Sequence, residues 1–191
     1  MAEPASPPEE PARPAFEGVK AVEGNGSYVG LTYDKLDITA SVDRVRSPKA
    51  GAVVLFIGTT RDNFEGKSVT TLEYTTYVPL ALRSLSAIVS SLKSTVNPSL
   101  HAISIIHRLG IVPIGEDSIV ISLSTSHRTE GWRIAEECLE LVKEKVEIWK
   151  REWFVDGGIW RANRDGAKGV TETVSSSEAE IPVELLEQAD R

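Results

Sequence analysis

The run Ala52-Val-Val-Leu-Phe-Ile57, closed by Gly58, is the stretch that decides the fold of this chain. The run is apolar throughout, too short for an ordinary helix, and rich in β-branched residues. A continuous apolar run of this length that ends at a glycine is typical of a strand buried on both faces. We therefore predict that residues 52–57 form a central strand of a sheet.

Further strands and helices are predicted on both sides of this run. The strands are Tyr28–Leu36, Thr70–Tyr77, Ala102–His107 and Ser118–Ser124, and the helices are Ile38–Val45, one opened by Pro79, and Glu130–Lys150. Asp37 and Thr129 are the expected caps of the first and last helices. The order predicts an α+β fold, with a mostly antiparallel sheet and helices packed on one face.

The length of 191 residues, 41% of them hydrophobic, fits one domain with a single core. We place this domain at residues 26–165. Residues 1–25 are rich in Pro, Glu and Ala without periodicity and are expected to form a disordered N-terminal tail. Residues 166–191 are expected to form an acidic, mostly disordered C-terminal tail.

The formal net charge of −7 is concentrated in the terminal segments. Residues 1–50 carry 6 basic and 8 acidic side chains, residues 166–191 carry 2 and 6, and residues 51–165 carry 13 and 14. The central part is nearly balanced, so the basic surface typical of nucleic-acid binding is absent. Any anion site must be local.

A cytosolic location is expected from the same sequence. It has no apolar run of about eighteen residues, the length at which a membrane helix is considered. The acidic N-terminus lacks the basic and apolar regions of a secretory leader. Cys138 is the single cysteine and lies in an apolar-rich helix, so we interpret it as a core residue in a reducing compartment rather than as a nucleophile.

Lys143 and Lys150 are the leading candidates for chemistry. On one continuous helix their spacing would place both ammonium groups on one face, about 10 Å apart. This face lies beside a predicted core stripe formed by Ala135, Leu139, Val142, Val146 and Trp149. The alternative is a basic helix edge that only contacts solvent.

Other cations follow the ends of predicted strands. Arg61 ends the turn Gly58-Thr59-Thr60-Arg61, and Ser126-His127-Arg128 precedes the long helix. Arginine suits phosphate or carboxylate, and backbone N–H groups at a helix start also bind anions. If these segments converge with the lysines, they form a pocket for a doubly charged small anion.

Each element alone has an ordinary structural alternative. The Gly-Thr-Thr-Arg turn could be only a turn, His127 a structural histidine, and Arg108 a support behind the site. The sequence offers no metal-binding Cys/His spacing, no nucleophile elbow and no phosphate-binding glycine loop. We therefore predict no cofactor and no metal.

Six motifs, read in order over residues 28–165, resemble the large, catalytic subunit of molybdopterin synthase in its eukaryotic form. They are Gly51-Ala-Val-Val-x-Phe56-x-Gly58-Thr-Thr-Arg61, Leu72-Glu-Tyr74-x-x-Tyr77, Ile106-His-Arg-Leu-Gly110, Ser126-His127-Arg128, Lys143 followed by Ile148-Trp149-Lys150-x-Glu152, and Asp156-Gly followed by Trp160. The resemblance implies an α/β hammerhead-like fold. It also implies transfer of sulfur to cyclic pyranopterin monophosphate, forming the dithiolene of molybdopterin. The sulfur donor is the C-terminal thiocarboxylate of a small ubiquitin-like carrier subunit.

The resemblance also implies the roles of individual residues. Lys143 and Lys150 are the catalytic pair and also bind substrate. The remaining substrate-binding residues are Arg61, His127, Arg128, Arg151 and Glu152, and we add Thr59, Thr60 and Arg108 as supporting residues. The family forms a homodimer, and a heterotetramer with its carriers, and the neighbouring large subunit supplies part of the pocket; the His127-Arg128 step is a candidate for that part.

One residue departs from the family pattern. Glu147 stands where the family often has a proline before Ile-Trp-Lys. Because proline ends or kinks a helix, we expect the helix of this chain to continue smoothly through Lys150.

Two other functions remain open at this point. A non-catalytic scaffold could bind the tail of a ubiquitin-like partner, although it would not need Arg61, Arg128, Lys143 and Lys150 together. A module that binds RNA or a phosphorylated metabolite would need a basic stripe with exposed aromatic residues. The balanced charge of the central domain argues against nucleic acid as a partner.

Overall fold

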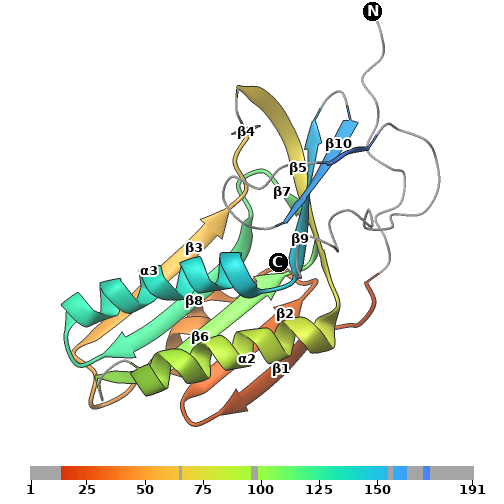
Figure 1. Cartoon of the computed structure of the whole chain (residues 1–191). Coiled ribbons are helices and arrows are strands. Elements are labelled where there is room, and N and C mark those ends of the chain that lie inside the picture. The colour runs from red at the N-terminus through yellow and green to blue at the C-terminus, as the bar shows by residue number, and fades with distance from the viewer. Residues whose placement is uncertain (1–13, 65, 96–98, 155–156, 163–169, 173–191) are drawn as a thin grey trace, which may run out of the picture.

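The computed structural model describes residues 14–64, 66–95, 99–154, 157–162 and 170–172 (Figure 1). Its helices are α1 (Ile38–Val45), α2 (Val78–Thr95) and α3 (Arg128–Lys145). Its strands are β1 (Val19–Gly24), β2 (Ser27–Thr32), β3 (Ala52–Thr59), β4 (Asn63–Phe64), β5 (Lys67–Thr76), β6 (Leu100–Arg108), β7 (Gly110–Pro113), β8 (Asp117–Thr125), β9 (Ile148–Phe154), β10 (Gly157–Ala162) and β11 (Val170–Glu172).

The strands form two sheets. One has the order β1-β2-β6-β8-β3; the other has the order β11-β10-β9-β5-β4, with β7 also paired to β5. Among the described pairs only β2 and β6 are parallel. The predicted α+β class and the mostly antiparallel pairing are confirmed.

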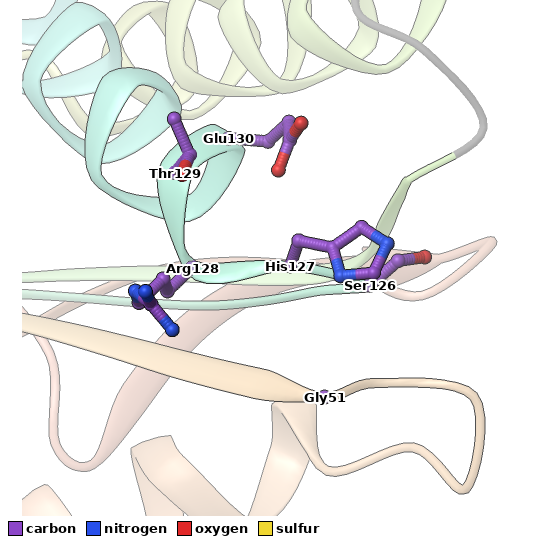
Figure 2. Close-up of a pocket in the computed structure, with 6 residues that line it drawn as sticks. All are labelled: Gly51, Ser126, His127, Arg128, Thr129 and Glu130. Atoms are coloured by element: carbon purple, nitrogen blue, oxygen red, sulfur yellow. The ribbon is translucent and has the colours of Figure 1, made fainter.

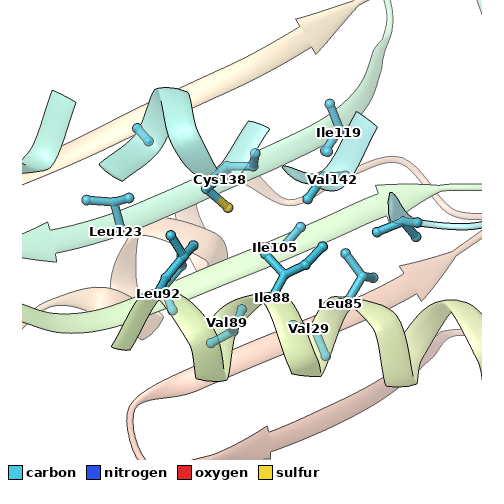
Figure 3. Close-up of a cluster of buried hydrophobic side chains, with 14 of the residues drawn as sticks. Val29, Leu85, Ile88, Val89, Leu92, Ile105, Ile119, Leu123, Cys138 and Val142 are labelled. Carbon is cyan, nitrogen blue, oxygen red and sulfur yellow. The ribbon is translucent and has the colours of Figure 1, made fainter. Parts of the chain in front are cut away.

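Helices α2 and α3 cover one face of the five-stranded sheet, as predicted (Figures 1 and 3). Ile105 and Leu123 point to this face and join the apolar cluster that includes Leu85, Ile88 and Cys138. Burial of such side chains contributes roughly 1.5–3 kcal/mol each.

Helix α1 lies against the opposite face, which differs from the prediction of helices on one face. Ser104 and Ser122 alternate with the apolar residues of β6 and β8, and their hydroxyls lie 3.4 and 2.7 Å from that of Ser41 on α1. All three serines are fully buried. Small polar residues on this face allow a short helix to approach closely. As predicted, Asp37 caps it by accepting a hydrogen bond from the Ala40 N–H.

The predicted central strand at residues 52–57 is an edge strand. In the described part of the chain, β3 pairs with β8 alone, and it ends the sheet order. Its side chains are mostly half-buried, and Val53 is 41% exposed. Pattern alone could not distinguish a strand covered within its own chain from one that ends a sheet.

The predicted helix from Glu130 to Lys150 is also wrong at both ends. His127, not Thr129, occupies the N-cap position, and the helix stops at Lys145 with Val146 in an extended conformation. Ile148 and Trp149 then begin β9, which pairs with β5 and β10. Aromatic and β-branched residues favour strands, and two ladders of hydrogen bonds outweigh continued helix. Glu147 therefore does not extend the helix, and its carbonyl accepts a hydrogen bond from the Thr76 hydroxyl.

Two strands lie within the segments that the sequence analysis assigned to the tails. Residues 19–24 form β1, which pairs along its whole length with β2, and residues 170–172 form β11 beside β10. Regular structure therefore extends beyond both predicted boundaries of residues 26–165. Residues 1–13 and 173–191, and with them most of both predicted tails, lie outside the described residues, as does Asp156 of the Asp156-Gly motif.

Cys138 is a core residue, as predicted. It is fully buried, and burial raises the pKa of its thiol to about 12. Among the described residues, no helix is both long and apolar enough to cross a bilayer.

Gly131 allows α3 to pack closely on β3. A Cβ atom at this position would lie 2.9 Å from both the Val54 Cγ2 and the Thr125 Oγ1. We expect Gly131→Val to lower the free energy of unfolding by about 1–3 kcal/mol, because overpacking forces the helix away from the strand. Urea unfolding measures this.

The control is Gly24→Ala, where a new Cβ would meet no described atom within 4 Å. Its unfolding free energy should change by no more than about 0.5 kcal/mol. A Gly131→Val protein as stable as the control would contradict close packing of α3 on β3.

Candidate active site

The two candidate lysines lie at the same end of α3 but on different elements. Lys143 is half-buried in the last turn of the helix, and Lys150 lies on β9 opposite Tyr74 of β5. The predicted arrangement of both lysines on one helix face is therefore wrong. The chain turns between them at Val146 and Glu147, which brings Lys150 onto the six-stranded sheet.

Lys150 is held between a buried carboxylate and an aromatic ring. Its Nζ lies 3.0 Å from Oε1 of Glu152 and 5.8 Å from the centre of the Phe64 ring. The Lys150 side chain is 19% exposed, whereas that of Glu152 is 2% exposed. Glu152 thus holds the side chain of Lys150 in place while part of that side chain remains exposed to solvent.

Buried polar side chains lie next to this pair. Tyr74 is paired with Lys150 across the two strands. The pKa of the Tyr74 hydroxyl is raised, mainly by burial and further by the charge of Glu152, and a hydrogen bond with Ser118 lowers it in part. The Tyr74 ring contacts the His107 ring edge-on. Burial lowers the pKa of His107 to about 4, so this imidazole is neutral near pH 7 and its Nδ1 donates to the Arg108 carbonyl.

Arg151 does not lie on the same face as Lys150 and Glu152. Successive strand side chains point to opposite faces, and the Arg151 guanidinium lies 3.6 Å from Glu73 and 4.8 Å from the centre of the Trp153 ring. Trp153 also donates its indole N–H to Glu73. The structure therefore places Arg151 among partners behind the strand and does not bring it to the Lys150 side.

Arg61 lies at the same end of the molecule as the two lysines. It is exposed and follows Thr59, the last residue of β3. Phe64 is only three positions further along the chain, so the two Cα atoms are at most about 11 Å apart. Because the Phe64 ring faces the Lys150 amine, the structure is consistent with Arg61 beside the lysines.

Thr60 and Arg108 occupy supporting positions. Thr60 is buried, and its N–H donates to the Glu116 carbonyl. The Glu116 carboxylate lies 2.6 Å from the side-chain nitrogens of both Lys35 and Arg108, and hydrogen bonds from these two lower its pKa. These contacts hold the turn between β7 and β8, which fits support of the site better than contact with a substrate.

His127 and Arg128 lie at the opposite end of α3. There they line an open pocket of about 570 Å³ with Gly51, Ser126, Thr129 and Glu130 (Figure 2). His127 caps no backbone N–H with its side chain. The first-turn N–H groups and the positive end of the helix dipole, together with Arg128, suit an anion.

One chain does not bring all the predicted site residues together. Lys143 lies fifteen positions after Arg128 on the helix, and at 1.5 Å per residue their Cα atoms lie roughly 22 Å apart. Each chain thus carries two separate cation groups. The lysine end contains Arg61, Lys143 and Lys150, and the histidine end contains His127 and Arg128.

Three contacting residues were not selected from the sequence as site residues. Phe64, Glu73 and Tyr74 contact Lys150 or Arg151, although only Glu73 and Tyr74 lay in a quoted motif. The pairing of β5 with β9 brings them to this place. It was not predicted, because Lys150 was expected to lie in a helix. Within the described ranges, no group of three or more His, Cys, Asp or Glu side chains is arranged to hold a metal ion.

Comparisons with known proteins agree on one family. The MoaE protein family model matches residues 31–145. The molybdopterin synthase catalytic subunit of Pyricularia oryzae is 57% identical over 146 residues, which cover 76% of this chain and 79% of that protein.

Solved structures are similar in fold. Molybdopterin synthase from Staphylococcus aureus matches with a TM-score of 0.65 and 30% identity, covering 69% of this chain and 94% of that one. A chain from the complex of subunits 1 and 2 of molybdopterin-converting factor from Helicobacter pylori matches with a TM-score of 0.55 and 20% identity, over 66% of this chain and 84% of that one; it supports the fold alone. On the family model and the sequence identities, this chain belongs to the MoaE family of molybdopterin synthase catalytic subunits.

Proposed function

We propose that this protein transfers sulfur from the C-terminal thiocarboxylate of a small ubiquitin-like carrier to cyclic pyranopterin monophosphate, forming the dithiolene of molybdopterin. Membership of the family makes the chain a sulfurtransferase of molybdenum cofactor biosynthesis. The observation that supports the reaction at this site is the pairing of Lys150 with buried Glu152, beside the helix end that carries Lys143.

Positive charge at the lysine end suits the two reactants. The pterin carries a cyclic phosphate and the carrier ends in a thiocarboxylate, so two anions must approach each other. The ammonium groups of Lys143 and Lys150 and the guanidinium of Arg61 offset this repulsion and orient both anions. Glu152 fixes Lys150 in position, because a buried ion pair with good geometry restricts a long side chain.

The transfer has two stages. For each of the two sulfur atoms, the thiocarboxylate sulfur attacks a carbon of the pterin side chain. A C–S bond forms as a C–O bond of that carbon breaks, the oxygen leaves with the phosphate or, once protonated, as water, and the carrier stays attached as a thioester. Water then cleaves the thioester, so that sulfur stays on the pterin and the carrier leaves as a carboxylate. Negative charge develops on the carbonyl oxygen in this second stage, and a nearby ammonium group stabilises it.

We assign Lys143 to the carrier carbonyl and Lys150 to substrate binding and proton transfer. Both lie at the end of α3 where Arg61 also lies, as described above. We assign Glu152 to holding Lys150 and place Arg151, bound to Glu73, in a structural role.

A second copy of the chain completes the site in this proposal. The helix length keeps His127 and Arg128 roughly 22 Å from Lys143 within one chain, so they would act on the phosphate bound at the lysine end of a partner. We therefore propose a homodimer with one carrier on each chain. A cytosolic location forms part of the proposal because the sole cysteine is buried and unpaired.

Reconstitution tests the function directly. We expect purified protein, a thiocarboxylated carrier and the cyclic pterin to yield a dithiolene product, detected after oxidation to its fluorescent pterin derivative. The control is the same carrier with an ordinary C-terminal carboxylate, which should give no product. A protein that binds the thiocarboxylated carrier but forms no dithiolene would support the scaffold function instead.

A further inference from the structure

Arg61 lies in the short connection between β3 and β4 (Figure 1), and the residues on both sides of it are anchored through their backbones. The Asp62 carbonyl accepts a hydrogen bond of 2.8 Å from the N–H of Val69 on β5, the strand that also pairs with Lys150. On the other side, Thr60 is bonded to the turn that joins β7 and β8. Because Arg61 is exposed, its neighbours in the chain determine the place from which its side chain extends.

Two backbone hydrogen bonds connect Thr60 to the turn. The Thr60 N–H donates to the Glu116 carbonyl over 3.0 Å, and the Gly115 N–H donates to the Thr60 carbonyl over 2.9 Å. The register of β3 with β8 ends before these bonds, at Thr59 opposite Asp117. The turn therefore holds the chain at a point that the pairing of β3 with β8 no longer reaches.

The turn is itself held by the carboxylate of Glu116. Its Oε1 lies 2.6 Å from Nζ of Lys35, and its Oε2 lies 2.6 Å from Nη1 of Arg108. Arg108 ends β6, and Lys35 follows β2, the parallel neighbour of β6. Hydrogen bonds from Lys35 and Arg108 lower the pKa of the Glu116 carboxyl, so it is ionised near pH 7. The Arg108 side chain is 11% exposed and that of Lys35 76%, so Arg108 is the firmer partner.

Glu116 thus connects the five-stranded sheet with the residue that precedes Arg61. We propose that Glu116 is a positioning residue of the active site, which sets the place of Arg61 relative to Lys150 without touching the substrate. The inference rests on the proposed function, in which Arg61 binds an anionic reactant at the lysine end. It assigns a role to a residue that lies outside the cation group itself.

Loss of this anchor would loosen one side of Arg61 only. The Asp62 carbonyl would remain bonded to Val69, so Arg61 would move about that point rather than leave the site. A group that binds a reactant must keep its place within about 0.5 Å, and a misplacement of about 1 Å can cost about 10²-fold. We therefore expect weaker binding of the cyclic pterin in a protein that remains folded.

Glu116→Gln tests this role with little change in side-chain shape. The amide has one acceptor oxygen, and its NH₂ group would face a donor of either Lys35 or Arg108, so one of the two contacts is lost. In single-turnover assays, we expect the pterin concentration that gives the half-maximal rate to rise about 5–20-fold. The rate at saturating pterin and the dependence on the carrier should change less than about two-fold.

Arg61→Ala distinguishes positioning from general support of the fold. If Glu116 acts through Arg61, adding Glu116→Gln to Arg61→Ala should increase the defect less than about two-fold, because the positioned group is already absent. Two defects that multiply would overturn the proposal. The matched control is Glu137→Gln, which breaks an exposed pair with Arg133 at 3.4 Å and should stay within about two-fold of wild type.

Amide hydrogen exchange, measured by NMR, checks the anchor without any turnover. In Glu116→Gln the Thr60 and Gly115 amides should exchange at least about 10-fold faster, because both bond across the loosened turn. The Val69 amide, bonded to the Asp62 carbonyl, should keep its wild-type rate. Unchanged exchange at Thr60 would overturn the proposal whatever the activity.

The outcomes separate this role from the proposed function. If the wild-type protein forms dithiolene but the substitutions at residues 61 and 116 act independently, the function holds and the role of Glu116 is wrong. If the wild-type protein forms no dithiolene, both fail, because Arg61 would then have no such reactant to bind.

Discussion

Replacing Lys143 or Lys150 by alanine is expected to reduce dithiolene formation by at least about 10²–10³-fold, the loss typical when a positioned stabilising group is removed. Each substitution removes a positive charge from the place where two anionic reactants meet. The measurement is a single-turnover assay with thiocarboxylated carrier and cyclic pterin at saturating concentrations, so that a loss of binding and a loss of chemistry are distinguished.

Lys145→Ala is the matched control for this experiment. Lys145 ends the same helix but is exposed, whereas Lys143 is half-buried. Its removal changes the net charge equally and should leave turnover within about two-fold of wild type, as surface substitutions usually do. Equal losses in Lys143→Ala and Lys145→Ala would show that only general charge matters.

Lys150→Ala needs a further correction for stability. The substitution leaves Glu152 buried without its Lys150 partner, and a broken buried pair costs about 3–5 kcal/mol. Turnover should therefore be compared below the unfolding temperature of the variant, per folded enzyme. Near-normal turnover of the folded variant would remove Lys150 from the mechanism.

A heterodimer of two inactive chains is expected to regain about half of wild-type activity if the site is shared between copies. One chain carries Lys143→Ala and the other Arg128→Ala, and two affinity tags select the mixed dimer. One of its two sites then contains both substitutions, whereas the other contains intact Lys143 from one chain and intact Arg128 from its partner. A site contained within one chain would give no recovery.

The matched control combines Lys143→Ala with Lys150→Ala. Both residues belong to the lysine end, so neither site of this mixed dimer is intact and it should stay inactive. Recovery here would show that the two lysines serve different sites. If the Arg128→Ala homodimer is fully active, Arg128 does not bind substrate, and its assignment fails before any mixing.

The sequence predicted the element types better than their surroundings. The strand over residues 118–124 and the Asp37 cap depend on neighbouring residues, and the structure has both features. The strand at residues 19–24 was missed because its partner, β2, rather than its own composition, stabilises it. Ser104 and Ser122, which contact α1, form no recognisable motif in the sequence. They lie side by side only because β6 and β8 pair.

For the candidate site, too, the residue types could be read from the sequence, whereas the surroundings of each residue could not. Residue type was enough to select Lys143, Lys150 and Arg61 as cations, and the structure places all three at one end of the molecule. The strand conformation of Lys150 was missed because Val146 and Trp149 fit a helical spacing equally well. Arg151 was assigned to the pocket from its motif alone, whereas in the strand it lies on the face opposite that of Lys150, because successive strand side chains point to opposite sides.

The position of Cys138 restricts the route that sulfur takes. The thiol of Cys138, the single cysteine of the chain, is fully buried in the apolar cluster between α3 and the sheet. Burial raises its pKa to about 12, so the thiol is neither ionised near pH 7 nor accessible to a reactant. Many sulfur-handling proteins relay the atom through a persulfide on their own cysteine, which requires an accessible thiolate. In the proposed reaction, Cys138 therefore carries no persulfide, and each sulfur atom would pass directly from the carrier to the pterin.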